Sequence, residues 1–274
     1  MFWHDVRVDF PHIDSTRPSV ARVYDAGLGG KDNYEVDREV LRAIDAAVPN
    51  HTIVPRDNRE WLIRITRYLA GQVGITQFLD LGSGLPTAEN THQIAQRVNP
   101  EATVVYVDND PMVLAHGRAL LEENDRTHFL SLDLTKPNDV FEHPDVRRYL
   151  DFSEPMALYQ IGTLHHLKDT DAIREIMREY VERLTPGSYL AVSHFHDPGG
   201  EDGQAARELE RVMSSGPMGS GYFRSREDIE SFFGGLDLVP PGLVHAPLWW
   251  PDGPQVKPLI TPQRLFLAGL AHKS

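Results

Sequence analysis

The chain has 274 residues, no cysteine and a formal net charge of −13, with 41% hydrophobic and 24% charged residues. Without cysteine it has no disulfide, thiolate metal site or cysteine nucleophile. An acidic surface repels phosphate backbones, so no nucleic acid partner is expected. The N-terminus lacks the basic and apolar stretches of a signal peptide, and no apolar run is long enough to span a bilayer. We therefore expect a cytoplasmic protein with no membrane partner.

The N-terminal segment, residues 1–73, differs in pattern from the rest and is predicted to be a loop and helical extension, or lid, on a main domain over 74–274. Three glycines within residues 27–30 allow backbone conformations closed to other residues, so 19–34 is predicted as an ordered loop rather than a helix. Apolar residues at helical spacing then predict helices over 36–49 and 55–69.

From residue 76 strand and helix patterns alternate, which indicates an α/β fold whose parallel sheet is doubly wound, with helices on both faces. The predicted strands are 77–81, 102–107, 127–132, 155–161 and 188–193, and the predicted helices are 87–98, 111–121 and 169–184. In the tail we expect helices over 204–213 and 225–233, a strand over 236–239 and an antiparallel last strand over 264–270. An insertion is predicted around 197–260.

The loop Asp80-Leu81-Gly82-Ser83-Gly84 stands between a predicted strand and a predicted helix. Ligands of doubly wound sheets bind at the carboxyl ends of the strands, where glycines let the main chain approach closely. The Asp80 carboxylate can accept hydrogen bonds from an ammonium group. A simple tight turn is the alternative for this motif alone.

Two further acids follow the next two strands. Asp108 lies 108 − 84 = 24 residues past Gly84, near the interval at which an acidic residue meets a ribose. Its alternative role is to cap the following helix, for which Asp110 is the better candidate. Asp133 follows the third strand. Three successive strands that each bring an aspartate to one edge predict ligand contact there.

These motifs resemble class I S-adenosylmethionine-dependent methyltransferases over residues 76–193. Residues 18–34, together with Gly84-Leu85-Pro86-Thr87, resemble a bacterial S-adenosyl methyltransferase family of largely undefined substrate. This second resemblance covers nearly the whole chain. The resemblance implies a Rossmann-like, mostly parallel seven-stranded sheet and S-adenosylmethionine as cofactor. Pro86 stands where the pattern often has a third glycine; proline suits a first helical turn, so the loop is altered rather than broken.

The resemblance also implies the roles of the site residues. Asp80, Gly82, Ser83 and Gly84 would lie at the methionine end, Asp108 at the ribose, Asn109, Asp133 and Leu134 at the adenine, and Gln160 near the transferred methyl group. Tyr24, Lys31, Asn33 and Tyr34 would contact the cofactor or the acceptor from the lid, with a surface arm as the alternative. For Arg56, Asn58 and Arg59 a carboxylate contact is considered, but a solvated helix start is favoured.

Methyl transfer needs mainly in-line positioning, and a base only where the acceptor loses its proton early. His165 and His166 follow the fourth strand and are the candidate catalytic residues, with packing or helix capping as the alternative. His194, His196 and Asp197 lack a further ligand at a diagnostic spacing, so no metal is expected. Trp249 and Trp250 are candidates for an acceptor wall, a hydrophobic plug or a partner contact.

The leading hypothesis is methyl transfer to a small-molecule acceptor. An NAD(P)-dependent oxidoreductase is the alternative among enzymes, although Thr87 occupies the last glycine position of its Gly-x-Gly-x-x-Gly pattern. A non-catalytic regulatory protein that binds S-adenosylmethionine is the third. The pattern selects neither an acceptor atom nor an oligomeric state.

Overall fold

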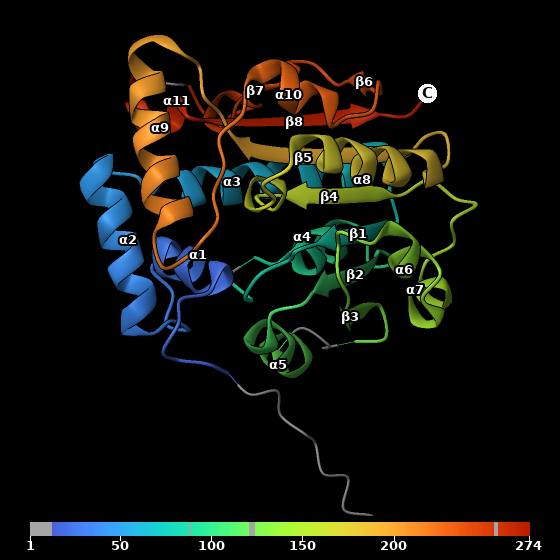
Figure 1. The fold of residues 1–274 in the computed structure, drawn as a ribbon. Helices are drawn as coiled ribbons and strands as arrows, with labels where there is room; N and C mark the ends of the chain where they lie inside the picture. Colours follow the sequence, from blue (N-terminus) through green and yellow to red (C-terminus); the bar gives the residue numbers. More distant parts are fainter. Residues whose placement is uncertain (1–12, 88, 121–123, 255–256) are drawn as a thin grey trace, which may run out of the picture.

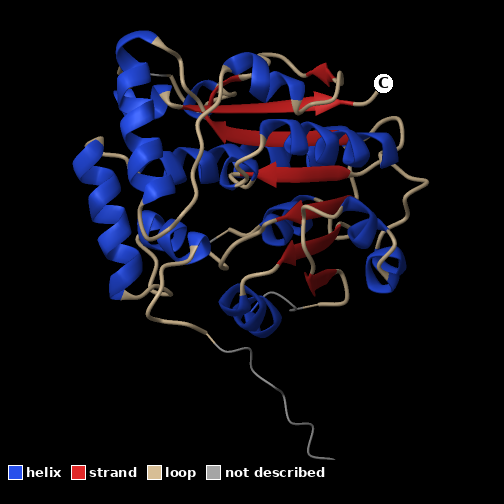
Figure 2. Ribbon diagram, in the orientation of Figure 1, coloured by secondary structure: helices blue, strands red, loops and turns tan. Residues whose placement is uncertain are grey.

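A computed structural model describes residues 13–87, 89–120, 124–254 and 257–274. Its sheet has the strand order β3-β2-β1-β4-β5-β8-β6, with β7 paired to β8 (Figures 1 and 2). The strands are β1 (Gln77–Leu81), β2 (Thr103–Asp108), β3 (Thr127–Ser131), β4 (Ala157–Ile161), β5 (Tyr189–Phe195), β6 (Asp237–Leu238), β7 (Val244–His245) and β8 (Phe266–His272). The first five are parallel, and β8 runs antiparallel to β5 and β6.

The predicted doubly wound, mostly parallel sheet is confirmed, with one correction. The described sheet has eight strands rather than seven, because a two-residue segment of the loop after β6 pairs with β8 at Val244 and Ala268. So short a strand leaves no periodic signal in the sequence. None of the helices in the described ranges combines the length and the apolar character needed to cross a bilayer.

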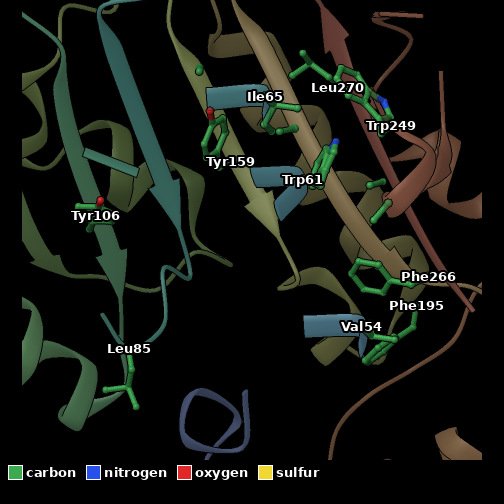
Figure 3. Close-up of a cluster of buried hydrophobic side chains, with 14 of the residues drawn as sticks. Val54, Trp61, Ile65, Leu85, Tyr106, Tyr159, Phe195, Trp249, Phe266 and Leu270 are labelled. Atoms are coloured by element: carbon green, nitrogen blue, oxygen red, sulfur yellow. The ribbon is translucent and has the colours of Figure 1, made fainter. Parts of the chain in front are cut away.

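Helices cover both faces of the sheet because neighbouring strand residues point to opposite sides. Phe78 of β1 belongs to the core beneath α3 and α4, whereas Leu79 belongs to a second core beneath α6, α7 and α8. Figure 3 shows part of the first core. These helices are α3 (Ile53–Tyr68), α4 (Thr91–Val98), α6 (Pro137–Phe141), α7 (Pro144–Tyr149) and α8 (Thr170–Arg183). Later in the chain or between these helices lie α5 (Pro111–Leu120), α9 (Gly200–Ser215), α10 (Arg226–Ser231) and α11 (Thr261–Arg264).

The N-terminal segment contains a helix where a loop was predicted. α1 (Val20–Leu28) begins after Ser19, whose hydroxyl accepts a hydrogen bond from the N–H of Arg22, and it ends at Gly29, which has a left-handed φ of 79°. Glycine is favoured at this position, just after a helix. The glycine cluster was therefore a helix end, and only residues 29–34 form the predicted loop before α2 (Glu35–Ala47).

We call α1, α2 and the loop between them, residues 20–47, the cover. A buried ion pair fastens it: Asp37 accepts hydrogen bonds from Nε of Arg22 at 2.8 Å and from the N–H groups of Ser19 and Tyr34. Both side chains of the pair are almost fully buried. The cover also packs against α9, and Asp32 lies 3.5 Å from Nδ1 of His116 on α5. It therefore touches elements on two sides.

Helix α3 packs within the main core. Trp61 meets Trp249 edge to face, and Arg64 donates to the carbonyl groups of Ala246 and Trp249, each at 2.9 Å. A π-helical turn, Leu69–Val73, follows α3. The division of the chain at residue 73 and the insertion around 197–260 stay predictions.

Smaller differences concern two short helices and some element ends. The helices α6 and α7 were not predicted. Helix α4 begins at Thr91 rather than residue 87, because Asn90 caps it and its N–H donates a hydrogen bond to Gln93. Position 121, the predicted end of α5, lies outside the described residues.

Replacing Asp37 with Ala is expected to lower the free energy of unfolding by about 3–5 kcal/mol, because it leaves the buried Arg22 charge unpaired. Glu35→Ala is the control: Glu35 is exposed and pairs with Arg38 and Arg42, so its removal should change stability little. Urea unfolding followed by circular dichroism measures both. Equal effects of the two substitutions would show that the buried pair does not stabilise the cover.

Candidate active site

A cavity of about 570 Å³ lies at the carboxyl ends of the parallel strands. Residues at or just after the ends of β1, β2, β3, β4 and β5 line it, and side chains of the cover and of α9 complete the lining. Figure 1 shows α1, α2 and α9 grouped beyond the arrowheads of β4 and β5. The predicted site residues that line the cavity are Tyr24, Asp80, Gly82, Ser83, Gly84, Asp108, Asn109, Asp133, Leu134, His165 and His166.

Three of the four predicted site residues in the cover do not line the cavity. Lys31 is exposed, and Tyr34 lies beneath the Arg22 guanidinium. Asn33 donates to the Asp25 carboxylate at 2.8 Å and accepts from Arg38. These contacts hold the loop after α1 in shape. A contact between these residues and the cofactor stays a prediction.

Gln160 lies behind the cavity wall. Its Oε1 accepts a hydrogen bond from Oγ1 of Thr163 at 2.7 Å, and Thr163 itself lines the cavity. Nε2 of Gln160 is buried and has no hydrogen-bond partner among the described residues. A buried donor without a partner costs free energy, so this group is suited to a ligand that supplies an acceptor.

The glycine loop is shaped for close approach. Gly82 has a φ of 71°, and a Cβ atom there would lie 2.4 Å from Cγ2 of Thr163. Asp108 fastens this loop, because its carboxylate accepts from the N–H of Gly84 and from the N–H of Asp110, each at 2.9 Å. Asp110 in turn accepts from the N–H of Met112 and caps α5, as the sequence suggested. A carboxylate has about four acceptor positions, so Asp108 retains two for a ligand.

Asp80 is buried at the end of β1 and accepts a hydrogen bond from Oγ1 of Thr91 at 2.7 Å. Burial raises the pKa of this carboxyl to about 6, although Thr91 and the Arg59 charge oppose the shift. Burial also raises the pKa of Asp108. The strand ends thus concentrate acidic groups in a site that favours a cationic ligand.

Arg59 is the only lysine or arginine among the described residues that line the cavity. Its Nε is buried without a hydrogen-bond partner in the described part of the chain. The sequence favoured a solvated helix start for Arg59. Helical spacing could have indicated that it faces the cavity, because Pro55, Arg59 and Leu62 lie on one face of α3 and all line the cavity.

The histidine turn, residues 164–166, follows β4. The ring of His165 lies 3.9 Å from that of Phe195, and its Nδ1 has no hydrogen-bond partner among the described residues. Nδ1 of His166 lies 2.9 Å from Oγ of Ser220. Burial lowers the pKa of His166 to about 4 and lowers that of His165 well below its usual value. Both imidazoles are therefore neutral near pH 7.

Arg224, which the sequence reasoning did not select, holds the chain after this turn. Its Nη2 donates to the carbonyl groups of Leu167 and Lys168, and its Nη1 lies 3.1 Å from Nε2 of His194. Arginine only donates, so Nε2 of His194 accepts and its Nδ1–H donates to the Phe195 carbonyl at 2.7 Å. Both ring nitrogens of His194 are thus engaged. Within the described ranges no three His, Asp or Glu residues form a group that would hold a metal.

Trp249 and Trp250 do not line the cavity. Trp249 is fully buried against Trp61, and Trp250 packs edge to face on Tyr68. Of the three readings of this pair, the hydrophobic plug describes Trp249.

Comparison with known proteins decides the family. The family model described as S-adenosyl methyltransferase matches residues 7–274. The chain belongs to this family. The predicted recognition is therefore confirmed, and the enzyme class and S-adenosylmethionine as cofactor are those of the family.

Two solved structures are similar over nearly the whole chain. One, called a "putative methyltransferase", is from Thermobifida fusca YX; it is 46% identical, covers 94% of this chain and 95% of its own, and has a TM-score of 0.88. The other is a DUF574 family protein from Streptomyces avermitilis MA-4680. It is 36% identical, covers 96% of this chain and 100% of its own, and has a TM-score of 0.88.

A curated relative from Mycobacterium marinum is named "Putative S-adenosyl-L-methionine-dependent methyltransferase". It is 30% identical over an alignment of 179 positions that covers 60% of this chain. The match spans 56% of that relative, so the chain covers about half its length.

Replacing Asp80 with Asn is expected to stabilise the ligand-free protein at pH 8 but not at about pH 4. The pKa rises from 3.8 to about 6 on folding, so the folded state binds this proton more tightly and stability falls as pH rises through that window. A shift of about two units corresponds to at most about 3 kcal/mol. Thermal unfolding at the two pH values measures the effect.

Asp133→Asn is the matched control, with the opposite sign. Partial burial raises the pKa of Asp133, but hydrogen bonds from Thr135 and the Lys136 charge outweigh it and lower the pKa overall. Stability from this carboxylate is present above its unfolded pKa, so its loss should destabilise the protein at pH 8. An Asp80 variant that destabilises equally at both pH values would contradict the burial argument.

Proposed function

We propose that this chain transfers a methyl group from S-adenosylmethionine to a small-molecule acceptor bound in the same cavity. The observation that carries the proposal is one continuous cavity that joins the glycine loop, the strand-end acids and the histidine turn in a member of this family. A reaction between two ligands requires both in one space at contact distance.

The strand order supports a direction for the cofactor. Strands β3, β2 and β1 are neighbours in that order, and they end near Asp133, Asp108 and Asp80. We assign the adenine to Asp133 and Leu134, with Asn109 beside it, the ribose to Asp108, and the methionine part to Asp80 and the glycine loop. Asp108 has acceptor positions left for both ribose hydroxyls.

Unpartnered polar groups at the methionine end fit the charged ends of that ligand. Arg59 would pair with its carboxylate and the Asp80 carboxylate with its ammonium, and Oγ of Ser83 is also buried without a partner among the described residues. We place Gln160 behind the methionine part, with Nε2 free to donate. When bound, S-adenosylmethionine would supply a methyl group attached to a sulfonium sulfur, which is a good leaving group because it departs as a neutral thioether.

The protein's own contribution is mainly to position the ligands and exclude water. The cover closes the cavity, and Tyr24 of α1 fixes it by donating to the Pro55 carbonyl and accepting from Nδ2 of Asn58. His165 and His166 are neutral and accept a proton from an acceptor whose acidity rises as its new bond forms.

Two other functions remain as outcomes of the test. A dinucleotide-dependent oxidoreductase is disfavoured by family membership and by Thr87 in place of the last glycine. A non-catalytic protein that binds the cofactor would show the same affinities but no methylation of any acceptor.

Calorimetric titration with S-adenosylmethionine, S-adenosylhomocysteine and NAD tests the cofactor half of the proposal. Wild type should bind both sulfur nucleosides and not NAD. Asp108→Ala should weaken both by at least about tenfold, because two charged hydrogen bonds to the ribose are lost. Binding of NAD alone would overturn the proposal in favour of an oxidoreductase.

Arg59→Met is expected to weaken S-adenosylhomocysteine binding about 10- to 100-fold through loss of the carboxylate pair. Arg56→Met, an exposed position on the same helix that does not line the cavity, is the control with the same charge change. Adenosine, which has no carboxylate, should bind Arg59→Met as it binds wild type. Equal weakening of adenosine would mean that Arg59 only maintains the fold.

A further inference from the structure

The cavity lining changes character across the sheet. On the β3-β2-β1 side the lining is polar and acidic. On the β4-β5-β8 side it is mainly apolar and uncharged, with side chains from the cover, α3, α9 and the facing ends of β5 and β8. The residues that define this apolar half are Ile44, Val54, Phe195, Met213, Met218 and Phe266. Figure 3 shows Val54, Phe195 and Phe266 gathered at one end of the strands.

The apolar half has no charged lining group. The lysine, arginine and acidic residues among the described lining are Arg59, Asp80, Asp108, Asp110 and Asp133. Arg59 lies on α3, and the four acids lie at or just after the carboxyl ends of β1, β2 and β3.

The titratable groups of the apolar half are His51, His165 and His166. Burial lowers the pKa of His51 to about 4, as it does for His166, and the pKa of His165 is lowered further by burial and by the neighbouring histidines and Arg224. Of the three, His165 is the one whose protonation the Arg224 charge disfavours. All three imidazoles are neutral near pH 7.

A charged molecule in this half would lose much of its hydration and find no counter-charge, which is unfavourable. Aromatic rings and methionine side chains offer flat and adaptable contacts instead. Phe195 stacks on Phe223 and lies edge to face against Phe266, so its ring is held in place.

We infer that the methyl acceptor is an uncharged, largely apolar aromatic molecule that enters the β4-β5-β8 half of the cavity and presents a hydroxyl or amine group to the histidine turn. This rests on the proposed function, because the other half is assigned to the cofactor. The acceptor oxygen or nitrogen gains the methyl carbon and loses its proton to a histidine and then to solvent. The electron pair of the broken carbon–sulfur bond stays on sulfur.

The test uses three probes of one shape, 2-naphthol, 2-naphthoate and 2-naphthylmethylammonium, added to the full chain saturated with S-adenosylhomocysteine. Probe fluorescence measures binding. The neutral naphthol should bind at least tenfold more tightly than either charged probe. If S-adenosylhomocysteine itself does not bind, the proposed function fails. If it binds but the naphthol binds no better than the charged probes, the acceptor inference alone is overturned.

A matched pair of variants places the probe. Met218 follows α9 and is only partly buried, so it tolerates replacement better than the core residues. Met218→Lys adds a cation to the apolar half and should shift preference from naphthol towards naphthoate by at least tenfold, whereas Met218→Leu should keep the wild-type order. Unchanged preference in a folded Met218→Lys protein would show that the probe binds elsewhere, and would overturn the inference. The wild-type comparison stands if the lysine variant does not fold.

Discussion

Burial of both faces of one parallel sheet constrains everything else in this molecule. Leu79, Leu81 and Val107 point into one core, and Phe78, Val104 and Tyr159 point into the other, so neither face offers room for polar chemistry. Parallel strands bring all their carboxyl ends to one edge. The polar groups that follow those ends therefore meet there, and the cover needs to close only that edge.

The cover is itself held by polar contacts. The Asp25 carboxylate accepts hydrogen bonds from the side chain of Asn33 and the N–H of Asp32, and the Asp37 carboxylate accepts one from Arg22. A Cβ on Gly30 would overlap the Asp25 carboxylate, which explains why glycine stands there. The N-terminal motif that resembles the family is thus largely the set of residues that shapes the cover, and of its four predicted ligand contacts only Tyr24 reaches the cavity lining.

The central strands and the strand-end acids were predictable because they depend on local signals: short apolar runs, and acids directly after them. Arg224 was not, because its role depends on contacts between distant segments, such as its hydrogen bond to the Leu167 carbonyl. The helix α1 was missed for a different reason. Its glycines end a helix and pack it closely, at Gly29 and at Gly27 beside Pro55, and composition alone does not separate these uses from a loop.

The place of β8 in the sheet has a consequence for biosynthesis. It pairs along all of β5, yet β5 ends at Phe195 and β8 begins at Phe266, so the 70 residues 196–265 separate the two. At roughly 5–20 residues per second, a ribosome needs about 4–14 seconds to make that interval. During this time one edge of an apolar strand has no neighbour, and such an edge invites pairing with another chain. The nascent protein is therefore exposed to such pairing until β8 emerges.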